Sequence, residues 1–408
     1  MNLQLNTTTS TIQSDITVSG SKSESNRLLI LQQLYPNITI ENLSDSDDTH
    51  HLQEALSSSK EIADIGHAGT AMRFLTAFFA SQKGTTKILQ GSERMHNRPI
   101  EILVDALRSL GADIIYLEKE GYPPLQINGK ALTQHKVTIN GNVSSQYISA
   151  LLLIAPGLPN GLEVELVGKI TSVPYINMTL ALLHQLGIQA DFSGATIKVA
   201  AQPTIANQTV VVESDWSSAS YFYSLIAMSS LNSSVKLTAY KKDSLQGDAV
   251  LAEIYEHFGV TTQFHGNNIT ISKTSLHSTA ILEQDLKNAP DIAQTIAVTC
   301  FGLGIACELT GLHTLKIKET DRLEALREEL TKLGAVIKVT DESLHLAPAN
   351  QLNKNIAITT YNDHRMAMAF APLALKTTLI IKDAEVVTKS FRNFWNDMTK
   401  IGLQIQEV

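Results

Sequence analysis

The chain has 408 residues, of which 43% are hydrophobic and 18% are charged. This composition excludes a disordered or low-complexity protein, and the length predicts two or three domains with sizeable cores. The 40 Asp and Glu residues against 32 Lys and Arg give a net charge of −8, which is opposite in sign to that of a non-specific nucleic-acid binder.

The start of the chain, MNLQLNTTTSTIQSD, has neither the basic nor the apolar region of a secretory signal. Apolar runs such as ISALLLIAP, from Ile148, are shorter than the roughly 18 residues that a membrane-spanning helix needs. The two cysteines, Cys300 and Cys307, are too few for a disulfide framework. We therefore expect a cytoplasmic protein without a membrane partner.

One pattern recurs along the chain: an amphipathic helix, then a glycine, then a strand of alternating polarity. The glycines are Gly111, Gly187, Gly259, Gly334 and Gly402, which lie 76, 72, 75 and 68 residues apart by subtraction. A glycine after the last helical turn takes the left-handed conformation without strain from a Cβ. Residues 47–56 fit the helix alone, since SSSKEIAD replaces the expected glycine and strand. We predict six copies in two halves, with a boundary near Asp215, unless the matches are a coincidence of common helix-to-strand connections.

In the first half, basic, hydroxyl and glycine residues gather where helices are expected to begin. The segments are SGSKSESNR from Ser19, HAGTAMR from His67, SERMHNRP from Ser92 and VSSQYIS from Val143. Helix N-termini offer free N–H groups and the positive end of the helix dipole, so this pattern favours an anion site. The alternative is ordinary helix capping with solvated Lys and Arg side chains.

The second half adds mixed charge at further helix starts. Asp291 follows a proline, KETDR begins at Lys318, NDHR begins at Asn362, and Lys389 precedes the final helix. If these groups converge, they make a cationic site for a small, multiply anionic molecule, in which two carboxylates serve as base and acid. Capping by Asp291 and solvated surface charge are the alternative. The chain has no metal-ligand spacing, GxSxG elbow or Walker A loop.

Read together, the segments KSESNR, HAGTAMR, RPIEILVDALR, SSQYISALL, KETDRL and NDHRMAM closely resemble the 5-enolpyruvylshikimate-3-phosphate synthases, in that family's order. The resemblance extends from Lys22 to Lys389. It implies an α/β (α+β) fold of two similar domains, each with three copies of a βαβαββ unit in an inside-out α/β barrel. One domain is expected to hold residues 1–20 plus 216–408, and the other residues 21–215, with the active site in the cleft between them.

The implied reaction transfers the enolpyruvyl group of phosphoenolpyruvate to the 5-hydroxyl of shikimate 3-phosphate and releases phosphate, through a tetrahedral intermediate. It belongs to the shikimate pathway of aromatic amino-acid (chorismate) biosynthesis and needs no cofactor and no metal. Family members are inhibited by glyphosate, so we expect binding of that inhibitor near Gly69. The family also suggests a monomer, and no nucleic-acid partner is expected.

The resemblance assigns roles residue by residue. Asp291 would be the base on the 5-hydroxyl, and Glu319, with Lys22 or Lys389, would manage the proton at the methylene carbon. Shikimate 3-phosphate would be held by Lys22, Ser23, Arg27, Ser144, Ser145, Gln146, Ser172, Asp291 and Lys318. Phosphoenolpyruvate would be held by Lys22, Gly69, Arg98, Gln146, Arg322, Arg365 and Lys389.

The sequence departs from the family pattern at three positions. His67 stands where Asn is common, Phe74 replaces a frequent Pro, and Thr314 stands where some members use Asn. Two alternatives stay open: the fold-sharing enolpyruvyl transferase that acts on UDP-N-acetylglucosamine, and a non-catalytic sugar-phosphate binding protein. The former typically uses a loop cysteine, whereas residues 296–307, with both cysteines, are expected to form a buried helix.

Overall fold

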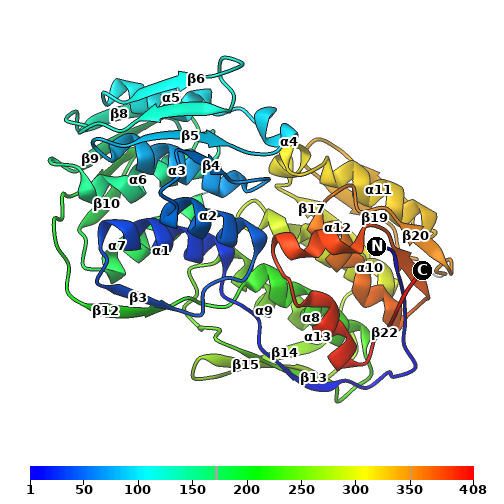
Figure 1. The fold of residues 1–408 in the computed structure, drawn as a ribbon. Coiled ribbons are helices and arrows are strands. Elements are labelled where there is room, and N and C mark those ends of the chain that lie inside the picture. The colour runs from blue at the N-terminus through cyan, green and yellow to red at the C-terminus, as the bar shows by residue number, and fades with distance from the viewer. Residues whose placement is uncertain (171–172, 350) are drawn as a thin grey trace. The chain divides into compact units, whose positions relative to one another are not determined.

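The structure is a computed structural model that describes residues 1–170, 173–349 and 351–408. The chain divides into two compact units. We call them the N-terminal unit, Gly20–Val212, and the C-terminal unit, Met1–Ser19 with Glu213–Val408. The borders expected from the sequence, after residues 20 and 215, differ from these by one and three residues. Helices and strands alternate along both units (Figure 1).

One βαβαββ repeat is complete within residues 62–128 of the N-terminal unit. Strands β4 and β5 are parallel and are connected through α3, and α5 then leads into the hairpin β6–β7. The sheet order is β4-β5-β7-β6, so the fourth strand lies between the second and the third. The bounds are β4 Ile62–Asp64, α3 Gly69–Ser81, β5 Thr86–Gln90, α4 Glu93–His96, α5 Glu101–Ser109, β6 Asp113–Tyr116 and β7 Leu125–Asn128.

The same strand order recurs in the next repeat of the N-terminal unit and in two repeats of the C-terminal unit. In the N-terminal unit the elements are β8 Lys136–Asn140, α6 Ser145–Ile154, β9 Leu162–Val167, α7 Val173–Gln185, β10 Ala190–Ser193 and β11 Thr196–Val199. In the C-terminal unit they are α8 Trp216–Met228, β13 Ser234–Thr238, α9 Leu251–Ile254, β14 Val260–His265, β15 Asn268–Lys273, β16 Ile281–Asp285, α10 Ala293–Leu303, β17 Ala306–Thr310, α11 Arg322–Lys332, β18 Ile337–Val339 and β19 Leu344–Leu346.

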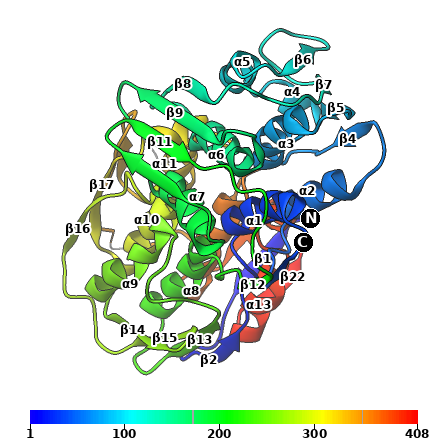
Figure 2. The same ribbon diagram turned by 90° about the vertical axis from the view of Figure 1, so that its left-hand side faces the viewer.

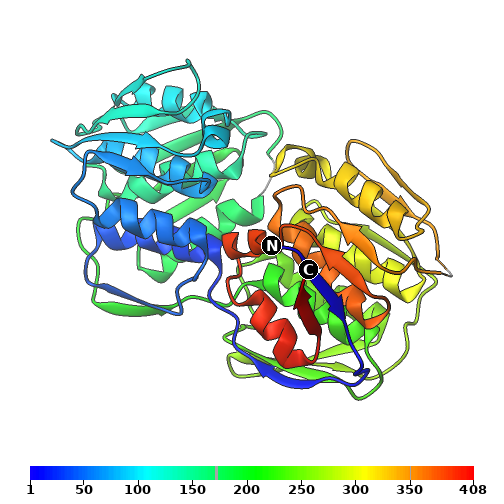
Figure 3. The ribbon, with the colours of Figure 1, turned by 45° about the vertical axis from the view of Figure 1, so that its right-hand side comes forward.

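The N-terminal residues complete two sheets of the C-terminal unit. Strand β2 (Gln13–Ile16) pairs in parallel with β13. Strand β1 (Leu3–Asn6) lies between β21 and β22, where Figure 3 shows the blue strand beside the dark red one. This last repeat comprises β20 Ile356–Ile358, α12 His364–Phe370, β21 Leu379–Ile381, α13 Phe394–Ile401 and β22 Gln404–Glu407, with β1 as its fourth strand.

The first repeat is reduced, as the sequence predicts. It contains α1 (Lys22–Leu34), β3 (Ile38–Glu41) and α2 (Asp47–Ser57). Within the described part of the chain, β3 pairs with a single strand, the parallel β12 (Gln208–Val211). After α2 the chain goes directly to β4, without a hairpin such as β6–β7, β10–β11, β14–β15 or β18–β19. The five repeat glycines all have positive φ, from 74° at Gly259 to 111° at Gly402, so their predicted role in ending helices is confirmed.

Helices form the interior of each unit and the sheets cover them. Along α8 every residue is buried, as are nearly all residues of α6, whereas β8 alternates between exposed and buried positions. Figure 2 shows the sheet of β8, β9 and β11 beside α6 and α7. One expectation is wrong: residues 296–307 are not one helix, because α10 ends at Gly304, with φ of 73°, and Cys307 lies in β17. Among the described residues, no helix is long and apolar enough to cross a membrane.

Candidate active site

Arg322 is the centre of an ion-pair cluster in the C-terminal unit. Its side chain is 2% exposed, and its guanidinium donates to three carboxylates: Asp363 at 2.6 Å, Glu319 at 2.8 Å and Asp291 at 2.9 Å. Such a geometry uses the planar fork of arginine, which can bond several oxygens at once. The guanidinium therefore fixes two predicted catalytic carboxylates in one place.

Three more cations surround the same two carboxylates. Lys389 donates to Glu319 at 2.6 Å, Arg365 lies 3.3 Å from Asp291, and Lys318 lies 3.6 Å from it. All six residues predicted for this unit thus belong to one connected cluster. We call it the ion-pair cluster: Asp291, Lys318, Glu319, Arg322, Arg365 and Lys389, with Asp363 behind them.

Local sequence explains why these groups meet. Asp321 caps α11 by accepting from the backbone N–H groups of Leu323 and Glu324, which places Arg322 in the first turn. Asp363 likewise caps α12 through the N–H of Arg365 and is fully buried. Because Asp363 also binds Arg322, the starts of α11 and α12 are held together.

The cluster changes the acidity of its members in a consistent direction. Burial alone raises the pKa of Asp291, but Arg365, Lys318 and Arg322 outweigh it and hold that pKa far below its usual range. Burial likewise opposes ionisation of Glu319, but Arg322 and Lys389 bring its pKa well below the usual value. Both carboxylates are therefore ionised at neutral pH.

Two further residues adjoin the cluster. Arg365 donates to the hydroxyl of Ser217 at 3.2 Å, and that hydroxyl donates to Asp248. Burial, together with the charge of Asp291, raises the pKa of Asp248 to about 7. Sequence reasoning missed Ser217, Asp248 and the role of Asp363; only the position of Asp363 beside Arg365 in NDHR gave a signal.

The N-terminal unit contains cations of a different kind. Arg27 is 2% exposed and donates to the hydroxyls of Thr179 and Ser149, at 2.8 and 3.1 Å, and to the carbonyl of Ser23, at 2.7 Å. Among the described residues no carboxylate lies within 4 Å of its nitrogens. Burial lowers the pKa of Arg27 to about 10, because a charge is costly away from water, and the attraction of Tyr175 and Glu24 offsets only part of this.

Arg98 lies over the start of α3. A Cβ added to Gly69 would meet its Nη1 atom at 2.3 Å, so only glycine leaves room for the guanidinium there. Arg73, one turn into α3, is 4% exposed and donates to the carbonyls of Gly69 and Pro99, each at 3.1 Å. Burial and the nearby charge of Arg98 lower the pKa of Arg73 to about 10.

The remaining predicted ligands of this unit lie at the starts of α1 and α6. Lys22 opens α1 and lies 3.3 Å from Asp48. Ser144 caps α6 by accepting from the N–H of Gln146, and Ser145 follows it. Gln146 donates to Thr70 at 3.1 Å, which connects the starts of α6 and α3. Ser172 lies outside the described residues.

The three departures lie close to these groups or in the other unit. The ring of His67 meets that of His51 edge to face at 5.8 Å. Phe74 is buried, and its ring lies 5.5 Å from the guanidinium carbon of Arg27, so the helix begins at Gly69 without the proline. Thr314 lies in a short 3-10 helix, and its buried hydroxyl has no hydrogen-bond partner among the residues that the structure describes.

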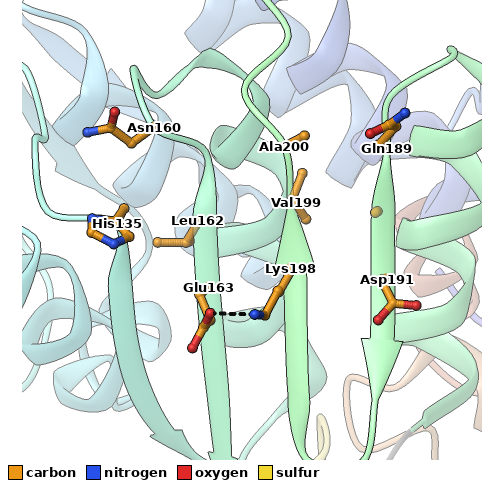
Figure 4. A pocket seen from close by; sticks show the side chains of 10 residues that line it. His135, Asn160, Leu162, Glu163, Gln189, Asp191, Lys198, Val199 and Ala200 are labelled. Atoms are coloured by element: carbon orange, nitrogen blue, oxygen red, sulfur yellow. Dashed lines mark ion pairs between the residues drawn. The ribbon is translucent and has the colours of Figure 1, made fainter.

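A pocket elsewhere in the N-terminal unit does not include any predicted site residue. Figure 4 shows it over β9, β10 and β11, where the ion pair of Lys198 and Glu163, at 3.0 Å, crosses between strands. Its lining mixes His135, Asn160 and Asp191 with aliphatic side chains. The predicted site is built from helix N-termini, not from this face of the sheet.

Comparisons with known proteins identify the family. The model of EPSP synthase (3-phosphoshikimate 1-carboxyvinyltransferase) matches residues 51–398. A protein of Bacteroides fragilis named 3-phosphoshikimate 1-carboxyvinyltransferase is 45% identical over 97% of both chains, and one of Haemophilus influenzae is 38% identical over 97% of this chain and 98% of its own.

Solved structures show the same fold. An EPSP synthase of Acinetobacter baumannii superposes with a TM-score of 0.80 at 20% identity, and the enolpyruvyl transferase NikO of Streptomyces tendae with 0.75 at 14%, each covering the whole of this chain and 98% or more of its own. The predicted mixed α/β fold is thereby confirmed. The chain therefore belongs to the EPSP synthase (3-phosphoshikimate 1-carboxyvinyltransferase) family.

Proposed function

We propose that this chain carries out the reaction of its family, transferring the enolpyruvyl group of phosphoenolpyruvate to the 5-hydroxyl of shikimate 3-phosphate with release of phosphate. The reaction is a step of the shikimate pathway. The observation that carries this proposal is the ion-pair cluster, which holds Asp291 and Glu319 ionised among four cations. An addition followed by an elimination needs one group that takes a proton from oxygen and another that serves carbon.

Shikimate 3-phosphate is assigned to the starts of α1 and α6 and to two residues of the cluster. The free N–H groups and positive dipole ends of these helices suit a phosphate. Arg27 donates to neutral acceptors only, so its charge is available to attract the phosphate, while most of its N–H groups are already used. The residues assigned are Lys22, Ser23, Arg27, Ser144, Ser145, Gln146, Ser172, Asp291 and Lys318.

Phosphoenolpyruvate is assigned to three cations of the ion-pair cluster, to the starts of α1 and α6, and to Gly69 and Arg98 at the start of α3. Arg98 has no carboxylate within 4 Å among the described residues, and it lies against Gly69. The residues assigned are Lys22, Gly69, Arg98, Gln146, Arg322, Arg365 and Lys389. Their number fits a substrate that has both a carboxylate and a phosphate group.

The chemistry proceeds in two stages in this proposal. Asp291 accepts the proton of the 5-hydroxyl as that oxygen attacks C2 of phosphoenolpyruvate, and C3 gains a proton from the Glu319 side of the site, with Lys22 or Lys389 as the donor. Elimination then returns a proton from the new methyl group to Glu319 while the C2–O bond to phosphate breaks. When the anionic substrate binds to Arg365, it neutralises part of the positive charge that stabilises ionised Asp291. The pKa of Asp291 then rises, and the carboxylate becomes a stronger base.

The alternative enolpyruvyl transfer to UDP-N-acetylglucosamine is not favoured. Cys300 and Cys307 are both fully buried, and burial raises the pKa of the Cys300 thiol well above its usual value. Neither thiol can therefore reach a substrate as an acid. Both cysteines are free thiols, which also supports the proposed cytoplasmic location, where thiols stay reduced. A monomer that works without a nucleic-acid partner stays part of the proposal.

Phosphate release from the purified chain tests this function. We expect release only when shikimate 3-phosphate and phosphoenolpyruvate are both present, with glyphosate competing against phosphoenolpyruvate. Release with UDP-N-acetylglucosamine instead of shikimate 3-phosphate would assign the other transferase reaction. If no phosphate is released with either acceptor, the chain is an anion-binding protein and the proposal is contradicted.

A further inference from the structure

A hydrogen-bonded chain connects the ion-pair cluster to a buried acid that the proposed mechanism does not use. Asp248 is 7% exposed and lies in the short 3-10 helix Gly247–Val250 that precedes α9. It accepts from the Ser217 hydroxyl, and that hydroxyl accepts from Nη2 of Arg365 at 3.2 Å. The same Nη2 atom lies 3.3 Å from Asp291. One guanidinium nitrogen is therefore shared between a predicted catalytic carboxylate and a hydroxyl aligned by Asp248.

The elements that carry this chain fix its geometry. Ser217 lies in the first turn of α8, which Asp215 caps by accepting from the N–H of Ser218 at 2.7 Å. Arg365 lies in the first turn of α12, where Asp363 accepts from its backbone N–H at 2.9 Å. These caps fix the backbone at both helix starts. The position of the Arg365 guanidinium then depends on the groups that it contacts, Ser217 and Asp291.

We propose that Asp248 is a positioning residue for Arg365: through the Ser217 hydroxyl it holds the guanidinium beside Asp291, and its charge sets how strongly Arg365 attracts the carboxylate of phosphoenolpyruvate. This inference rests on the proposed function. A protonated Asp248 leaves Arg365 with more uncompensated positive charge and therefore favours binding of the substrate anion. An ionised Asp248 competes with the substrate for the same cation.

The surroundings of Asp248 place this change in the physiological range. The charged groups that face it are Asp291, Arg365 and Asp215, and Ser217 supplies the hydrogen bond. Burial and the charge of Asp291 raise the pKa of Asp248 to about 7, and Arg365 and Ser217 limit that rise. The carboxyl group of Asp248 therefore changes its charge at a higher pH than an ordinary aspartate.

The test is the Michaelis constant for phosphoenolpyruvate at pH 6 and pH 8.5 in the wild type and in Asp248→Asn. Asparagine keeps an oxygen for Ser217 but no charge. We expect similar constants at pH 6 and, at pH 8.5, a constant about 3- to 10-fold lower in the variant, with kcat changed less. Because the phosphate of the substrate also titrates, only the ratio between the two proteins is interpreted. Asp243→Asn, an exposed acid five residues earlier, removes the same charge and should leave the ratio at one.

Two outcomes would overturn the inference. One is a ratio that does not change with pH. The other is an unchanged constant in Ser217→Ala, which breaks the chain while it keeps the acid, and which we expect to raise the constant several-fold at both pH values. If Asp248→Asn does not fold, the serine variant alone decides. Failure of the proposed function is distinguishable, because the wild-type chain would then release no phosphate in the same assay.

Discussion

In the C-terminal unit, each of the cations Lys318, Arg322, Arg365 and Lys389 lies within 4 Å of a carboxylate, whereas in the N-terminal unit Arg27, Arg73 and Arg98 have no such partner among the described residues. Of the substrate ligands predicted in the N-terminal unit, Lys22 does have a carboxylate partner, Asp48. The paired cluster holds acids and bases in a defined ionisation state. The charges of Arg27, Arg73 and Arg98 are not neutralised by a carboxylate of the described residues. The difference teaches that a buried cation is accommodated in two ways: Arg322 by ion pairs with carboxylates, and Arg27 and Arg73 by hydrogen bonds to neutral acceptors.

The largest effect should come from removing the proton-accepting carboxylate of Glu319 from the ion-pair cluster. Glu319→Gln keeps the shape of the side chain but cannot transfer the proton, so we expect kcat to fall about 10³-fold. Binding of shikimate 3-phosphate, followed by calorimetry, should change little. Glu324→Gln, an exposed acid in the first turn of α11, five residues after Glu319, is the matched control. A kcat that falls less than 10-fold in Glu319→Gln would contradict the assigned role.

Replacing an arginine should affect stability differently in the two units. Arg322→Met leaves Asp363, Glu319 and Asp291 without their shared cation, and we expect a loss of about 3–5 kcal/mol in the free energy of unfolding. Arg27→Met removes a buried charge that has only neutral partners, so its loss should stay within about 1 kcal/mol. Urea unfolding followed by far-ultraviolet circular dichroism measures both. Equal losses would remove the distinction between the units.

A substitution at the start of α3 tests the role of Arg98 without changing any charge. Gly69→Ala adds a Cβ that would lie 2.3 Å from Arg98, so the guanidinium must move. We expect the Michaelis constant for phosphoenolpyruvate to rise about 10- to 100-fold, because an error of about 1 Å in the position of a binding group has effects of this size. The constant for shikimate 3-phosphate should stay within about twofold. An unchanged constant for phosphoenolpyruvate would remove Arg98 from the site.

The smallest effect concerns acid. The folded-state pKa values of Asp291 and Glu319 lie below their unfolded values, so their stabilisation is present above about pH 4–5 and is lost as the pH falls through the folded values. Asp248 has the opposite effect: because its pKa is raised to about 7, it destabilises the folded chain at high pH, and this loss of stability disappears at low pH. We expect the C-terminal unit to lose about 1–3 kcal/mol between pH 5 and pH 3.

Tryptophan fluorescence measures this directly, because the chain has two tryptophans and both, Trp216 and Trp395, belong to the C-terminal unit. The urea midpoint by fluorescence should fall between pH 5 and pH 3. Arg322→Met, without the central cation, should show a smaller fall. A wild-type midpoint that does not move would mean that the cluster does not lower the pKa values of Asp291 and Glu319.

Much of the fold could be predicted because it depends on local rules. The repeat glycines end helices wherever they occur, since glycine adopts positive φ without strain. The loss of the hairpin after α2 is visible as SSSKEIAD, in which Ile62–Asp64 already forms β4 of the next repeat. The helix in residues 296–307 was misjudged because a continuous apolar run does not distinguish a buried helix from a buried strand. Gly304 was the available signal.

The sequence by itself determined which residue types stand at helix starts, and therefore that an anion site built from Lys, Arg, Ser and Gly exists. Only the tertiary structure decided which charges are paired. Asp248 is 43 residues before Asp291 and 117 before Arg365, so no local pattern connects them, yet packing of α8, α12 and the start of α10 brings them together. Acidity depends on burial and on charges within a few ångströms, and both are properties of the folded chain.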